Sequence, residues 1–358
     1  MDRTAPAAKS RSRLSGLDAL RLLAAAGVMI AHYGDRLYPR WMLVWHLQGA
    51  LCVNVFFVIS GLVIMISAQA APSGRQFLLR RASRLYPAFL ICMLFTVLVK
   101  YTQGIHISII EFIGNLTMIP NILNVTPIAG AYWTLSHEWS FYAMVAVLFA
   151  VVRRNCMAIM VSWVAISAVM QLAGSDNIAL NIVANVGFAP LFAAGMFLHL
   201  VRTGQLRLVP AVVIGAVLTA ASVGGSWGGP FWPGFPLSAA YLLCFVCCVG
   251  LVAALAAVEL PPSLNRAAMI GGAASYPLYL VHAPVARLLF PVLSSIGLGA
   301  GGVMAASMLA AVALAVATSQ WIEAPARHLL AGGIRRARLI CAGCSDVVLR
   351  LRATTLAD

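Results

Sequence analysis

Long apolar segments recur along almost the whole chain, and they constrain its fold more than any other feature. A helix needs about 20 apolar residues, at about 1.5 Å each, to cross the hydrocarbon core of a bilayer. Only 9% of the residues are charged, whereas soluble domains average about 25%. The sequence therefore predicts an all-α polytopic membrane protein with about ten transmembrane helices. Window hydropathy puts them at about 15–34, 48–68, 85–101, 131–152, 156–173, 178–201, 208–223, 237–257, 268–290 and 299–322.

The basic residues are distributed unevenly between the loops. Nineteen of the 24 Lys and Arg residues fall in the two tails and in alternate loops, whereas the remaining loops hold only Arg36, Arg40 and Lys100. Because cytoplasmic loops carry the excess of Lys and Arg, both termini are predicted to be cytoplasmic. The net charge of +14 then indicates contact with anionic membrane lipid and not with nucleic acid.

The predicted domain organisation is simple. Residues 1–13 form a basic cytoplasmic tail, 14–327 form the membrane domain, and 328–358 form a second basic tail. The basic start leads directly into a full-length span, which predicts a signal anchor and not a cleaved signal peptide. Residues 105–128 are only partly apolar, so they form either an outer loop with an interfacial helix or an eleventh, broken span.

The first apolar segment carries ionisable side chains. Arg21 and His32 are eleven residues apart, close to three helical turns, so they project from one face about 16 Å apart. Such groups are costly in a membrane span and usually face a protein interior or a wet cavity. This pattern suggests a reaction channel, although Arg21 could instead pair with Asp18 one turn earlier.

Two further clusters carry polar chemistry. Arg80, Arg81 and Arg84 precede the third span, where they could bind phosphate groups or simply contact anionic lipid. Glu138 lies about two turns into the fourth span, near the depth expected for His32. Its carboxylate could orient the imidazole, hold a hydroxyl acceptor, or form an interhelical hydrogen bond.

Together these motifs resemble the membrane acyltransferase-3 family from about residue 16 to residue 327. The similarity is carried, in family order, by Arg21-x10-His32, the run Val53 to Gly61, Arg80-Arg81-x-x-Arg84, Trp133-Thr134-Leu135-x-x-Glu138, Ser275-Tyr276-x-x-Tyr279-x-x-His282 and Glu323-x-Pro325. The resemblance implies an O-acyltransferase in the bacterial inner membrane, which moves an acyl group, expected to be acetyl from acetyl-CoA, to a hydroxyl of an envelope carbohydrate or lipid-linked glycan.

The resemblance also suggests roles for the site residues. Arg21, Arg80, Arg81 and Arg84 are expected to hold the CoA phosphates. His32 is expected to act as general base, since an imidazole titrates near neutral pH, with Glu138 orienting the imidazole or the sugar.

The sequence also bears on metal binding and on an alternative function. No metal is expected, because the single Cys341-x-x-Cys344 pair has no second pair to complete a site. The alternative function is a transporter or flippase for a lipid-linked sugar, which would favour pseudo-symmetric halves with matching broken spans.

Overall fold

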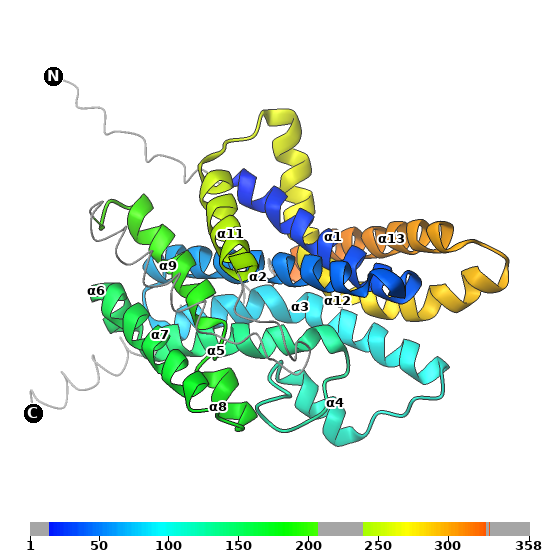
Figure 1. The fold of residues 1–358 in the computed structure, drawn as a ribbon, viewed down its shortest axis with the longest axis horizontal. Helices are drawn as coiled ribbons and strands as arrows, with labels where there is room; N and C mark the ends of the chain where they lie inside the picture. Colours follow the sequence, from blue (N-terminus) through cyan, green and yellow to red (C-terminus); the bar gives the residue numbers. More distant parts are fainter. Residues whose placement is uncertain (1–13, 207–238, 327–328, 330–358) are drawn as a thin grey trace, which may run out of the picture.

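The computed structural model describes residues 14–206, 239–326 and 329 of the 358-residue chain. Within that part, every regular element is helical, as the all-α prediction required (Figure 1). The elements are α1 (Ser15–Leu37), η1 (Pro39–Trp41), α2 (Met42–Gln69), α3 (Gly74–Thr102), α4 (Ile109–Leu116), η2 (Gly130–Tyr132), α5 (Trp133–Val147), α6 (Phe149–Arg154), α7 (Cys156–Leu172), α8 (Ile178–Val183), α9 (Ala189–Arg202), α11 (Ala239–Ala257), α12 (Pro262–Ser295), α13 (Ala300–Ala317) and η3 (Thr318–Glu323).

Five of the described helical segments are long and apolar enough to cross a membrane: Ser15–Leu37, Pro39–Gln69, Gly74–Thr102, Pro262–Ser295 and Ala300–Ala326. Shorter apolar helices cover Cys156–Leu172, Ala189–Arg202 and Leu243–Ala257. The predicted span at 208–223 and the tail cysteines Cys341 and Cys344 lie outside the described residues, as do residues 1–13 and almost all of 328–358. The total of about ten spans and the cytoplasmic termini stay predictions.

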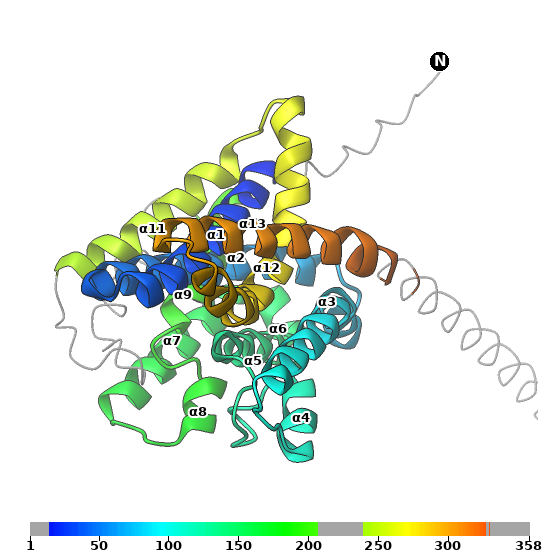
Figure 2. The same ribbon diagram turned by 90° about the vertical axis from the view of Figure 1, so that its right-hand side faces the viewer.

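The centre of the bundle is formed by α1, α2 and α12. Helix α1 packs along both α12 and α2, while α12 also contacts α3 and α13. Helices α4 and α8 lie on the side of this bundle opposite α11 (Figures 1 and 2). Helix α2 approaches α9 closely through Gly61 and Gly195, where an added Cβ would overlap the carbonyl oxygen of Phe192 or of Val58. Small residues permit such close packing of apolar helices.

Helix α3 begins earlier than the predicted span at 85–101. It starts at Gly74, where the hydroxyl of Ser73 accepts a hydrogen bond from the backbone N–H of Gln76 at 3.3 Å. Arginine is a good helix former, so the basic residues continue the helix that the apolar residues require. The arginine cluster therefore stands on α3 itself and not in a loop, with Arg81 and Arg84 toward the bundle interior and Arg80 on the surface.

Two other predicted spans are interrupted. The segment expected at 131–152 divides into α5 and α6 at Leu148. The segment expected at 178–201 divides into α8 and α9 around Asn185 (φ +52°) and Gly187 (φ +79°), both in the left-handed region. The side chain of Asn185 is fully buried and lies 2.9 Å from Nδ1 of His137, which holds the break in place.

The partly apolar segment at 105–128 contains one short helix. Helix α4 is about 12 Å long, too short to cross a bilayer, and it exposes Ile109, Ile110 and Ile113 on its surface. It begins with a capping box between Ser108 and Glu111. Hydrogen bonds from Ser108 lower the pKa of Glu111, so the carboxylate stays ionised at neutral pH. This geometry agrees with the interfacial helix and not with an eleventh span.

Candidate active site

A cavity of about 100 Å³ opens among α1, α2, α3, α5 and α12. Its polar lining includes three arginines, two carboxylates and three tyrosines, namely Arg21, Arg81, Arg84, Glu138, Glu323, Tyr142, Tyr276 and Tyr279. We call this the arginine cavity. It unites residues that are more than 250 positions apart in the sequence. Three of the four arginines and the glutamate that the sequence analysis selected lie in its wall.

Arg81 is the most buried of these arginines, with 8% of its surface exposed. Its guanidinium donates a hydrogen bond to the hydroxyl of Ser67 and lies 5.8 Å from the ring centre of Phe77 and 5.9 Å from that of Tyr142. Aromatic faces attract a guanidinium and hold its plane in place. Arg84, one turn later, forms no hydrogen bond or ion pair with any other described side chain, so its donors are available to a ligand.

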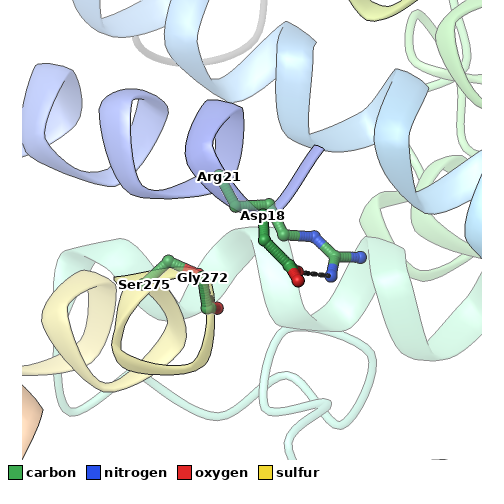
Figure 3. Close-up of polar contacts among 4 residues, drawn as sticks. All are labelled: Asp18, Arg21, Gly272 and Ser275. Atoms are coloured by element: carbon green, nitrogen blue, oxygen red, sulfur yellow. Dashed lines mark hydrogen bonds and ion pairs between the residues drawn. The ribbon is translucent and has the colours of Figure 1, made fainter. Parts of the chain in front are cut away.

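Arg21 pairs with Asp18 of its own helix, and Asp18 packs against α12. Nη1 of Arg21 lies 3.7 Å from Oδ1 of Asp18, and the pair stands against Gly272 and Ser275 of α12 (Figure 3). The hydroxyl of Ser275 donates to the carbonyl oxygen of Gly272 at 2.8 Å. Arg21 therefore both pairs with Asp18 and lines the cavity. The pairing with Asp18 therefore does not remove Arg21 from the cavity wall.

The substitution Gly272→Ala should displace Arg21 indirectly, because the added Cβ would contact Asp18 on the same helix. An added Cβ would lie 2.6 Å from Cβ and 2.8 Å from Cα of Asp18, so α1 must shift away from α12. Overpacking of this kind costs about 1–3 kcal/mol. We expect a lower melting temperature in detergent. Gly250→Ala on α11 is the matched control, since nothing lies within 4 Å of its added Cβ. If Gly272→Ala and Gly250→Ala lowered the melting temperature equally, this account would be contradicted.

Glu138 faces the arginine cavity and not His32. Its Oε1 accepts hydrogen bonds from the hydroxyl groups of Tyr142, one turn later, and of Ser60, the latter at 3.4 Å. Glu138 thus fixes the tyrosine on whose ring Arg81 rests. The expectation that Glu138 orients the imidazole of His32 is not met by any contact among the described residues. Its position supports the arginines instead.

His32 contacts His282 of α12. Nδ1 of His32 lies 2.8 Å from Nε2 of His282, and the ring centres are 5.0 Å apart. His282 is fully buried, and its backbone carbonyl accepts a hydrogen bond from the hydroxyl of Tyr33 at 2.9 Å. His32 itself is exposed on the surface of α1. Tyr279 lies between the two sites, since it lines the arginine cavity and its ring centre is 5.9 Å from that of His282.

The hydrogen bonds of His282 assign the tautomers of the neutral pair. Nδ1 of His282 lies 3.3 Å from the carbonyl oxygen of Leu278, which can only accept a hydrogen bond, so this nitrogen carries the hydrogen. Nε2 of His282 is then the acceptor for Nδ1–H of His32. It follows that Nε2 of His32 carries the free lone pair. That atom is the one able to take a proton.

Arg80 is the predicted site residue that the structure places outside the cavity. It is exposed, and its Nη1 donates to the carbonyl oxygen of Ala70 at 3.2 Å. Conversely, the sequence analysis assigned no role to Tyr142, Ser67 or His282. A spacing of four residues from Glu138 could have suggested Tyr142. His282 is 250 residues from His32, and no local pattern links them.

Across residues 14–206 and 239–326, no three His, Cys, Asp or Glu side chains come together in a way that could hold a metal ion.

The fold and the site define a class: an all-helical protein with several helices suited to a membrane, an arginine-lined internal cavity, and a histidine pair beside it. The acyltransferase-3 family model, described as "Acyltransferase domain", matches residues 14–322. The chain belongs to this family and is an acyltransferase. This makes it an enzyme.

Curated relatives agree with the family. The chain is 29% identical over 311 residues to "Exopolysaccharide production protein ExoZ" of Rhizobium meliloti (strain 1021), covering 82% of this chain and 93% of the relative. It is 27% identical over 311 residues to "Acyltransferase MdmB" of Streptomyces mycarofaciens, covering 77% and 79%. "Nodulation protein 10" of Rhizobium leguminosarum bv. viciae is 25% identical over 174 residues, covering 40% and 47%. No solved structure matches the chain.

Proposed function

We propose that this acyltransferase moves an acetyl group from acetyl-CoA to a hydroxyl of an envelope carbohydrate in the bacterial inner membrane. The observation that carries the proposal is the placement of Arg21 and His32 on one helix, α1, about 16 Å apart, with Arg21 in the arginine cavity. Arg21, Arg81 and Arg84 would bind the CoA phosphates at the cytoplasmic end. The pantetheine arm would then extend along the bundle toward His32.

The reaction needs one base and no covalent enzyme intermediate. Nε2 of His32 takes the proton of the acceptor hydroxyl while the hydroxyl oxygen attacks the thioester carbonyl. The new C–O bond forms and the C–S bond breaks, so the sulfur leaves as a thiolate and receives the proton from His32. The products are an O-acetyl ester and CoA thiol. The name of the relative ExoZ, which refers to exopolysaccharide production, supports a carbohydrate acceptor.

The experiment uses membranes that contain the protein and acetyl-CoA labelled in the acetyl group. We expect label to enter a carbohydrate fraction and to be released by mild alkali, since an O-acetyl ester is alkali-labile. Membranes without the protein are the control. Labelled acyl-CoA that stays intact, or label that resists alkali, would refute an acetyl ester made from this donor.

His282 should act as a positioning residue for His32. Without its Nε2, nothing in the described structure selects the tautomer of His32, so we expect His282→Ala to lower kcat by about tenfold. His282→Gln keeps an acceptor near Nδ1–H of His32 and should recover part of that loss. A merely structural role predicts equal losses in both variants and a change in the KM for acetyl-CoA, which we expect to stay constant.

A further inference from the structure

A second cavity, of about 150 Å³, lies at the other end of the helices that form the arginine cavity. Its wall contains three cationic side chains, Arg36 of α1, Lys100 of α3 and Arg287 of α12. No acidic residue is among the described residues that line it. We call it the distal cavity.

The rise of the helices separates the two cavities. Along α1, Arg36 is 15 residues beyond Arg21, which corresponds to about 22 Å. Along α3, Lys100 is 19 residues beyond Arg81, or about 28 Å. Helices α1 and α3 thus present cations to both cavities, whereas α12 presents one only to the distal cavity. In the proposed orientation the distal cavity is extracytoplasmic, where Lys and Arg are otherwise scarce.

The distal cavity adjoins the histidine pair. Arg36 follows His32 by four residues, one helical turn, so both project toward the same side of α1. On α12, Ala283 and Pro284 line the cavity directly after His282. A molecule held there would have its nearby groups within reach of the imidazole of His32.

The nearest carboxylates, Asp35 and Glu111, attract Arg36 and Lys100 from a distance, but each is bound to another partner. Asp35 points to His46, with Oδ1 3.4 Å from Nε2. The carboxylate of Glu111 accepts hydrogen bonds from the backbone and hydroxyl of Ser108 at 2.8 and 2.9 Å. In the part of the chain that the structure describes, neither Arg36 nor Lys100 forms an ion pair.

Arg287 is the third cation, and its neighbours are neutral or positive. Its guanidinium donates to the side-chain oxygen of Gln103 at 3.4 Å, while the amide of Gln103 donates to its backbone carbonyl at 2.9 Å. It is close enough to both Arg36 and Lys100 for each pair to repel. Arg36 is exposed, and Lys100 and Arg287 are half-buried. Three cationic side chains that line one cavity give it a positive potential, which favours an anion there.

We propose that the distal cavity binds an anionic group of the acceptor, so that this enzyme acts on an acidic or phosphate-linked carbohydrate and not on a neutral one. This inference rests on the proposed function, because it takes the acceptor to be the molecule beside His32. Two sources supply the same chemistry: the diphosphate of a lipid-linked glycan, or a carboxylate of the sugar itself. Either would fix the carbohydrate so that one hydroxyl meets Nε2 of His32.

The test measures anion binding by the purified full-length protein in detergent, with CoA at saturation so that the arginine cavity is filled. The probes are inorganic pyrophosphate and glucuronate, titrated by calorimetry. We expect the wild type to bind one of the two probes. Arg36→Gln or Arg287→Gln should lower the affinity for that probe by about tenfold or more, since a charge-assisted hydrogen bond is lost. Preference for pyrophosphate indicates the phosphate source, and preference for glucuronate the carboxylate source.

Arg40→Gln is the matched control, because Arg40 is an exposed arginine at the same end of the molecule but does not line the cavity. Retained CoA binding shows that each variant is folded, and Arg36→Lys should keep part of the affinity. Absence of binding by the wild type, or equal weakening in Arg40→Gln, would overturn the proposal. Transfer of labelled acetyl is measured separately, so its absence in the wild type counts against the proposed function instead.

Discussion

His32→Ala is expected to reduce acetyl transfer by about 10³-fold while leaving the protein folded and able to bind CoA. General base catalysis contributes about 10²–10⁴ to rates. His32 carries the free lone pair of the histidine pair, and its surface is exposed one helical turn before Arg36 of the distal cavity. It does not line the arginine cavity, so donor affinity should not change. The measurement is the initial rate of label transfer in membranes with matched protein amounts.

His106→Ala serves as the control for this experiment. His106 is also exposed and lies in the loop before α4, with its ring against that of Tyr101. We expect its rate to equal that of the wild type. Transfer by His32→Ala at a near-normal rate would remove His32 from the mechanism, whereas loss of CoA binding in that variant would indicate a structural role.

Arg81→Gln is expected to weaken CoA binding by about 10- to 100-fold, which corresponds to the roughly 1.5–3 kcal/mol of a hydrogen bond to a charged group. Arg81 is buried in the wall of the arginine cavity and is held over Tyr142, so its guanidinium is pre-positioned for a phosphate. Arg81→Lys keeps the charge but loses the planar fork, and should recover only part of the affinity. The measurement is the dissociation constant of CoA for the purified protein.

Arg80→Gln is the control for the arginines, since Arg80 is adjacent in sequence but exposed and outside the cavity. The affinity of Arg80→Gln for CoA should stay within about twofold of the wild-type affinity, because a single surface charge contributes little. Arg84→Gln tests the same cavity through a residue without a side-chain partner, and it should resemble Arg81→Gln. If Arg80→Gln lost as much affinity as Arg81→Gln, a general surface charge and not the cavity would hold the donor.

The sequence alone determined the class of the fold, and it selected four of the residues that line the arginine cavity. The scarcity of charged residues excluded a soluble domain, and apolar length predicted helices, because a bilayer leaves few other ways to satisfy the backbone. Arg21 and His32 could be placed on one face because both lie on one regular helix. Their axial separation follows from helix geometry and needs no tertiary contact.

Only the tertiary structure decided which side chains meet. Adjacent residues such as Arg80 and Arg81 point about 100° apart on a helix. Which of them faces the cavity depends on the rotation of α3 about its axis, and the packing of α3 against α12 and α5 sets that rotation. The same reason explains why Glu138 faces the arginines and why His282, far away in the chain, takes the place beside His32. Helix periodicity orders residues along one element, but the register between elements is a property of the packed bundle.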